Sequence, residues 1–191
     1  VEVFAGGLAV MAAVFEELGV ETMTVTDAAL RDGVFYDFIG RSLNEDMREQ
    51  TVALFQQRYH VSQSQAARVA HTAALLLESL SQNASVHELN HWRQYLRWAA
   101  QLHEIGIDIA YTAYHKHTAY ILDQADMPGF SRKEQQILAA LTLGQRGDLR
   151  KVADTIAAGP MMSHALFALR LAVLFNRARL PLTLPQFTQL R

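Results

Sequence analysis

The sequence contains no cysteine among its 191 residues. This absence excludes a disulfide scaffold and zinc sites built from cysteine, and it fits a protein of the reducing cytosol. No apolar run reaches the length of about 20 residues that a membrane-spanning helix requires. Charged residues are sparse, at 19%, and half of all residues are hydrophobic, so the composition indicates a folded globular chain. We therefore expect a cytoplasmic protein without a membrane span.

The net charge of −2 conceals a strong asymmetry along the chain. Residues 1–50 carry a net charge of −7, whereas residues 51–191 carry a net charge of +5. A basic excess of this size indicates a polyanionic partner. A solvated surface with ordinary ion pairs is the alternative, and on the sequence alone it is the simpler explanation.

The first forty residues and the rest of the chain show different patterns. Apolar spacing predicts a helix over 8–18 that ends at Gly19, and β-branched alternation predicts a strand over 22–26. A second helix over 27–38 follows. One strand cannot form a sheet alone, so we expect the chain to be part of a longer protein with an N-terminal region that supplies the partners.

From residue 42 onward the sequence predicts an almost entirely helical array. Ser62 and Ser131 suit N-caps, residues 127–129 suit a turn, and Pro160 suits the start of the last helix. The predicted helices span residues 43–59, 63–81, 87–104, 114–124, 132–143, 147–158 and 161–178.

Two early segments carry a family resemblance. Residues 3–10 read VFAGGLAV and residues 26–37 read TDAALRDGVFYD. Together they resemble the end of the phosphatase core in the exopolyphosphatase / guanosine-pentaphosphate phosphohydrolase (Ppx/GppA) family, which is an actin-like fold of two lobes. The resemblance implies a C-terminal fragment, closest to an exopolyphosphatase. Residues 1–40 would be the remnant of the phosphatase lobe, and residues 41–191 a helical domain.

The helical part resembles the HD phosphohydrolase fold, which binds a divalent metal through a His, a His-Asp pair and a late Asp. The corresponding positions here are His71, His103 with Glu104, and Val173. Valine cannot ligate a metal, so we expect a degenerate HD-like domain that binds no metal. His71 and His103 are then expected to be core histidines, bonded to backbone or to Glu104. The alternative is an active metal-dependent HD phosphohydrolase that uses His71, His103 and Glu104.

Several basic residues are candidates for binding a phosphate chain. Lys116 lies near a predicted helix N-terminus, where free N–H groups and the helix dipole favour an anion. Gly6 and Gly7 are candidates for a backbone approach to phosphate in the cleft of the actin-like fold, or else form a tight strand-to-helix turn. The other candidate polyphosphate-binding residues are Arg93, Arg97, His115, His117, Arg146 and Arg150.

The resemblance implies an enzyme that hydrolyses the terminal phosphoanhydride of inorganic polyphosphate with Mg²⁺. The catalytic residues and Mg²⁺ would belong to the missing lobes, so this chain would hold no catalytic residue and no cofactor. It would bind the polyphosphate chain and contribute to a homodimer, with no nucleic-acid partner. Guanosine pentaphosphate is the alternative substrate, and a pure interaction module without a phosphate role is a further alternative.

Overall fold

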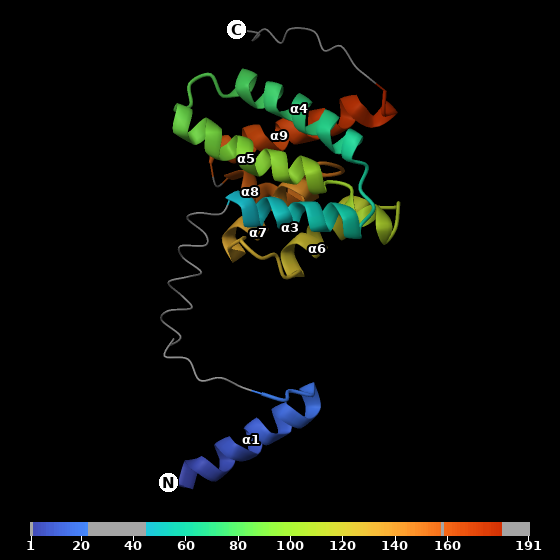
Figure 1. Cartoon of the computed structure of the whole chain (residues 1–191). Coiled ribbons are helices and arrows are strands. Elements are labelled where there is room, and N and C mark those ends of the chain that lie inside the picture. The colour runs from blue at the N-terminus through green and yellow to red at the C-terminus, as the bar shows by residue number, and fades with distance from the viewer. Residues whose placement is uncertain (1, 23–44, 158, 181–191) are drawn as a thin grey trace. The chain divides into compact units, whose positions relative to one another are not determined.

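The computed structural model describes residues 2–22, 45–157 and 159–180, and all regular structure within them is helical (Figure 1). The chain divides into two compact units, residues 1–39 and residues 40–191. The mainly helical fold predicted from the sequence is therefore confirmed. The predicted helix over 27–38, and all but the first residue of the predicted strand over 22–26, lie outside the described residues.

The first unit contains helix α1 (Glu2–Leu18). Gly6 and Gly7 lie inside this helix, so the alternative interpretation, a tight strand-to-helix turn at these glycines, is wrong. The helical apolar spacing extends back past the glycines, and two glycines cost only about 2 kcal/mol of helix propensity. Gly19 ends the helix as predicted, with a φ of +61° and a hydrogen bond from the Val20 N–H to the Phe15 carbonyl.

The second unit is an array of helices whose order matches the sequence prediction. The described helices are α3 (Glu45–Arg58), α4 (Gln63–Leu80), α5 (Val86–Leu102), α6 (Tyr114–Gln124), α7 (Arg132–Gly144), α8 (Ala153–Ala157) and α9 (Pro160–Phe175). Two short 3₁₀ helices lie between them, η1 (Ile105–Asp108) after α5 and η2 (Leu149–Val152) after α7, and a third, η3 (Asn176–Ala178), follows α9. The predicted helix over 147–158 is thus a 3₁₀ turn followed by a short helix, and every described α-helix is too short or too polar to cross a membrane.

Local signals fix where these helices begin. The Ser62 hydroxyl accepts the Gln65 N–H at the start of α4. Ser131 forms a full capping box at α7, because its hydroxyl accepts the Glu134 N–H while the Glu134 carboxylate accepts the Ser131 N–H at 2.7 Å. Pro160 is the first residue of α9. Proline lacks a backbone N–H, and this costs nothing at the first helical position, because an N–H there has no acceptor within the helix.

Helix α5 lies at the centre of the second unit and packs against α3, α4, α7 and α9 (Figure 1). Its Trp98 is almost fully buried and meets the edge of Phe130, with ring centroids 4.9 Å apart. The Trp98 indole N–H donates to the Glu49 carboxylate of α3 at 2.7 Å. The end of α5 carries the chain into η1, and this junction positions the site described below.

Candidate functional site

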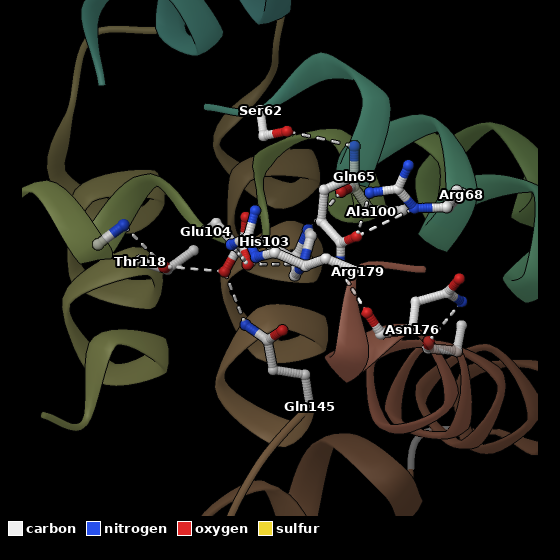
Figure 2. A network of polar contacts seen from close by, with 12 residues as sticks. Ser62, Gln65, Arg68, Ala100, His103, Glu104, Thr118, Gln145, Asn176 and Arg179 are labelled. Carbon is white, nitrogen blue, oxygen red and sulfur yellow. Dashed lines mark hydrogen bonds and ion pairs between the residues drawn. The ribbon is translucent and has the colours of Figure 1, made fainter. Parts of the chain in front are cut away.

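A pocket of about 270 Å³ opens where the end of α5, η1, the start of α6, the turn after α7 and the end of α9 meet. Figure 2 shows the polar contacts around its floor. Its walls combine arginines, buried amides and apolar side chains. The lining residues are Gln65, His103, Glu104, Ile107, Tyr111, Tyr114, Gln145, Arg146, Gly147, Arg170, Val173, Leu174, Arg177 and Arg179.

His103 forms part of the pocket floor and is only 1% exposed. Its Nδ1 lies 2.6 Å from the Ala100 carbonyl oxygen, so Nδ1 carries the proton and donates it to that oxygen. Burial lowers the pKa of His103, which keeps the ring neutral. Its Nε2 therefore carries a lone pair, which has no hydrogen-bond partner among the described residues and lies 3.8 Å from the Glu104 carboxylate.

Gln145, at the end of α7, forms the other part of the floor and is 2% exposed. Its Nε2 donates to the His103 carbonyl oxygen at 3.0 Å, as Figure 2 shows. The same carbonyl accepts the Thr118 hydroxyl at 3.2 Å, and that hydroxyl accepts the Gly106 N–H at 3.0 Å. These contacts tie α5, η1, α6 and α7 together below the pocket. Within the part of the chain that the structure describes, they leave the Gln145 Oε1 buried without a partner.

Gly106 permits the close approach of η1 to α6. A Cβ atom at this position would lie 2.2 Å from the Tyr114 carbonyl oxygen and 2.4 Å from the Thr118 nitrogen. Both are backbone atoms that cannot rotate away. Glycine is therefore required here for the floor to assemble.

Four arginines line the pocket. Arg170 donates to the Gly144 carbonyl at 3.0 Å and to the Gly147 carbonyl at 2.7 Å, and so braces the turn after α7. Arg146 lies 5.7 Å from the centroid of the Tyr114 ring. Arg179 donates to Glu104 at 2.6 Å. The fourth is Arg177. Glu104 is the one carboxylate among the described lining residues, so these residues make the pocket strongly electropositive.

Further cations surround the turn after α7. Burial and the charges of Lys151, Arg146, Lys116 and Arg170 lower the pKa of the buried His115 to about 4. The Lys151 ammonium donates to the Arg146 carbonyl at 2.6 Å, and burial lowers its pKa, with further lowering by neighbouring cations. Positive charge thus continues from the pocket onto the adjacent surface.

The structure brings together only some of the residues predicted for the HD-like positions. His103, Glu104 and Val173 all line the pocket. His71 does not, since it is exposed on α4 and lines a separate depression beside Arg93 and Arg97. The expectation that His71 is a core histidine is therefore wrong. The buried face of α4 contains Val69, Thr72 and Leu76, and His71 points away from it.

The basic candidates are also divided. Arg146 lines the pocket, and the buried His115 lies next to Gly147 in the turn after α7. Lys116 is exposed on α6 and His117 is half-buried. The other three arginines form ion pairs elsewhere: Arg93 with Glu78, Arg97 with Glu49 and Arg150 with Asp148. Gly6 and Gly7 belong to α1 in the first unit.

Sequence reasoning missed several lining residues, above all Gln65, Gln145, Arg177 and Arg179. The signal for Gln65 was present, because it lies four residues before Val69 on the apolar face of α4. The others lie at helix ends, and no periodic pattern marks them.

The donor set of the pocket does not fit a divalent metal. In residues 2–22, 45–157 and 159–180 there is no group of three or more His, Asp or Glu side chains that could hold a metal ion. Val173 occupies the position of the expected carboxylate, and Arg179 already neutralises Glu104. The arrangement is instead suited to an anion at the arginines.

Comparison with known proteins gives consistent matches. The model for the Ppx/GppA phosphatase family, domain III, matches residues 47–190. The guanosine-5′-triphosphate,3′-diphosphate pyrophosphatase of Pseudoalteromonas translucida is 41% identical over 187 residues, which cover 97% of this chain and 37% of that protein. The proteins of the same name from Aeromonas hydrophila and Vibrio atlanticus are each 36% identical, over 97% of this chain and 38% and 37% of their own lengths. The chain thus spans somewhat more than a third of the length of these relatives.

Proposed function

The chain belongs to the Ppx/GppA phosphatase family, and on that premise we propose that it supplies a phosphate-binding pocket to a phosphohydrolase acting on guanosine 5′-triphosphate,3′-diphosphate. The substrate is taken from the names of the relatives, which favour the guanosine pentaphosphate alternative over the exopolyphosphatase expected first. The reaction proposed for the whole protein is hydrolysis of a phosphoanhydride bond. Within it, this chain would bind the anionic substrate.

The observation that carries this role is the arginine lining of the pocket. Arg146, Arg170, Arg177 and Arg179 face one carboxylate, so a phosphate group entering the pocket meets an excess of guanidinium donors. Guanidinium groups bind phosphate oxygens through paired hydrogen bonds, which favours phosphate over a simple chloride-like anion. Arg170 is bonded to two backbone carbonyls, Arg146 lies over the Tyr114 ring and Arg179 is paired with Glu104. Among the described residues Arg177 has no such partner, so it is the arginine best placed to bind a ligand phosphate.

The bond-breaking groups are proposed to lie outside this chain. Glu104 is the one carboxylate among the described lining residues, and its Oε1 is already bound by Arg179 at 2.6 Å. His103 is neutral and fixed by its bond to Ala100. A catalytic Mg²⁺ bound by other parts of the whole protein, a homodimer and a cytoplasmic location stay predictions.

Inorganic polyphosphate is the second candidate ligand. It is favoured by Lys116 and Lys151, which extend the positive charge from the pocket along the turn after α7. A long polyanion would contact both groups of cations, whereas a nucleotide phosphate would require only the pocket.

Titration of this chain with pyrophosphate by isothermal calorimetry tests the proposal. Arg177→Gln should weaken binding by about 10- to 150-fold, because one charge-assisted contact is worth roughly 1.5–3 kcal/mol. Lys133→Gln is the matched control, since it also removes one exposed cation but lies at the start of α7, about 18 Å along the helix from Gln145. Equal affinities for the two variants, or affinity that does not fall as salt rises, would contradict phosphate binding in the pocket.

The same pair of variants in the full-length protein tests the link to activity. We expect orthophosphate release from guanosine 5′-triphosphate,3′-diphosphate to lose efficiency with Arg177→Gln and to be unchanged with Lys133→Gln. Turnover by this chain alone would show that the bond-breaking groups lie within it, which the proposal denies.

A further inference from the structure

Resting on that proposed function, we propose that Glu104 is an internal competitor for the phosphate ligand, because it holds Arg179 until phosphate oxygens take that arginine over. The ion pair joins Arg179 Nη2 to Glu104 Oε1 at 2.6 Å, and both residues line the pocket (Figure 2). A ligand that reaches Arg179 must therefore break an ion pair that the protein already makes. The pair would set how tightly the pocket binds phosphate and how readily it releases it.

The lining arginines differ in the kind of partner that holds them. Arg170 donates to backbone carbonyls and Arg146 lies over a tyrosine ring, so neither loses its positive charge to its partner. Glu104 is the one carboxylate among the lining residues that the structure describes, and it is bound by Arg179. Neutralising Glu104 therefore frees one particular guanidinium for the ligand.

The two side chains of the pair differ in exposure. The Arg179 side chain is 48% exposed, whereas the Glu104 side chain is 12% exposed. The guanidinium can thus be reached from solvent while the carboxylate forms part of the pocket wall. Water screens an ion pair with one half-exposed partner, so the pair can be broken at small cost. A phosphate group offers three acceptor oxygens and more negative charge than one carboxylate, so it can compete for Arg179.

The backbone that carries Arg179 is fixed to α4. The Gln65 side chain donates to the Asn176 carbonyl at 2.8 Å, and the Asn176 amide donates to the Thr72 hydroxyl at 3.0 Å. Asn176 begins η3 and is buried. The Arg179 N–H then donates to the Asn176 carbonyl at 3.0 Å. Arg179 can therefore change its partner by rotation of its own side chain, without movement of the chain.

The backbone on the Glu104 side is fixed as well. Glu104 directly follows His103, whose carbonyl oxygen accepts both the Gln145 amide and the Thr118 hydroxyl. The Glu104 carbonyl accepts the Ile107 N–H at 2.8 Å. Both partners of the ion pair therefore lie on backbone that hydrogen bonds hold in place, and the exchange of partners requires side-chain rotation alone.

Calorimetric titration of this chain with pyrophosphate tests the inference. Glu104→Gln keeps the length of the side chain and removes its charge, so we expect it to bind pyrophosphate about fivefold more tightly than the wild-type chain does. Asp108→Asn is the matched control, because it also removes a carboxylate from the region of η1, yet Asp108 pairs with His60 and does not line the pocket. Its affinity should stay within about twofold of the wild-type value.

A double-mutant cycle separates competition for Arg179 from simple repulsion of the ligand by the Glu104 charge. If Glu104 acts by holding Arg179, Glu104→Gln should gain much less affinity in an Arg179→Gln background than in the wild-type chain. Simple repulsion gives an equal or larger gain in that background, because Glu104 is then unpaired, and this result would overturn the inference. Arg179→Gln should also weaken binding more in the Glu104→Gln background than in the wild-type chain.

The outcomes also separate the inference from the proposed function. If pyrophosphate binds the wild-type chain and Glu104→Gln binds it no more tightly, the competitor role is overturned and the phosphate role stands. If pyrophosphate binds neither protein, the phosphate role is overturned as well. NMR of the wild-type chain decides the question even if Glu104→Gln does not fold. The signal of the Arg179 Nε–H should shift when pyrophosphate is added, and an unchanged signal would overturn the inference.

Discussion

Replacing Gly106 by alanine should strongly destabilise the second unit. The new Cβ would lie 2.2 Å from the Tyr114 carbonyl oxygen, 2.4 Å from the Thr118 nitrogen and 2.8 Å from the Thr118 Oγ1. An ordinary contact requires about 3.4 Å or more, so η1 and the first turns of α6 would have to separate by roughly 1 Å. That shift would also break the hydrogen bond from the Gly106 N–H to Thr118.

Two costs add in this variant. Overpacking a close backbone contact costs about 1–3 kcal/mol, and an unpaired buried N–H costs about 1–3 kcal/mol more. A total near 4 kcal/mol lowers the melting temperature by roughly 8–16 °C for a unit of this size. Thermal unfolding followed by far-UV circular dichroism measures the loss, because the described regular structure is all helical.

Gly144→Ala is the matched control. Its Cβ would lie 2.4 Å from a terminal methyl of Leu166, which is a side-chain atom that can move, and alanine regains about 1 kcal/mol of helix propensity. We expect its melting temperature to fall by less than half as much. A Gly106→Ala protein that melts no lower than Gly144→Ala would refute the reasoning that η1 and α6 are locked at backbone contact.

Thr118→Val should lower the free energy of unfolding by about 1–3 kcal/mol in a urea titration, because it leaves the Gly106 N–H without an acceptor. Thr118→Ser, which keeps the hydroxyl, should restore most of this loss. The low pKa of His115, about 4 when folded against 6.5, means that the unfolded chain binds more protons between these values. The free energy of unfolding should therefore be at its full value above pH 6.5 and fall as the pH drops towards 4. The fall should be shallower in His115→Asn, and an equal pH dependence in the two proteins would contradict this role of His115. Ser131→Ala should cost about 1 kcal/mol through loss of the capping box, whereas Ser131→Asp should cost much less.

The helices could be predicted because their signals are local. The spacing of Ala66, Val69 and Ala73 shows which face of α4 is buried, and Ser131 marks the start of α7. Interactions within one or two turns decide both features. The prediction placed α6 at its observed bounds, residues 114–124, and the start of α4 at residue 63.

The contents of the pocket could not be predicted in the same way. Arg97 and Arg146 look alike in the sequence, yet Arg97 pairs with Glu49 of α3 while Arg146 stacks on Tyr114 at the pocket. The choice depends on which helices lie side by side, and residues 49 and 97 are far apart in the chain. The prediction that His71 is a core histidine was wrong because it rested on the resemblance to the HD fold. The position of His71 relative to the apolar face of α4 indicates an exposed side chain instead.

By itself the sequence determined the helical composition, most helix ends and the resemblance to the Ppx/GppA family that the comparisons confirm. Tertiary structure alone decided that His103 and Gln145, 42 residues apart, share one pocket floor. It also decided that each has a buried acceptor atom without a hydrogen-bond partner in residues 2–22, 45–157 and 159–180. Burial and hydrogen-bond satisfaction depend on all the neighbours of an atom in space, and most of those neighbours come from distant parts of the chain.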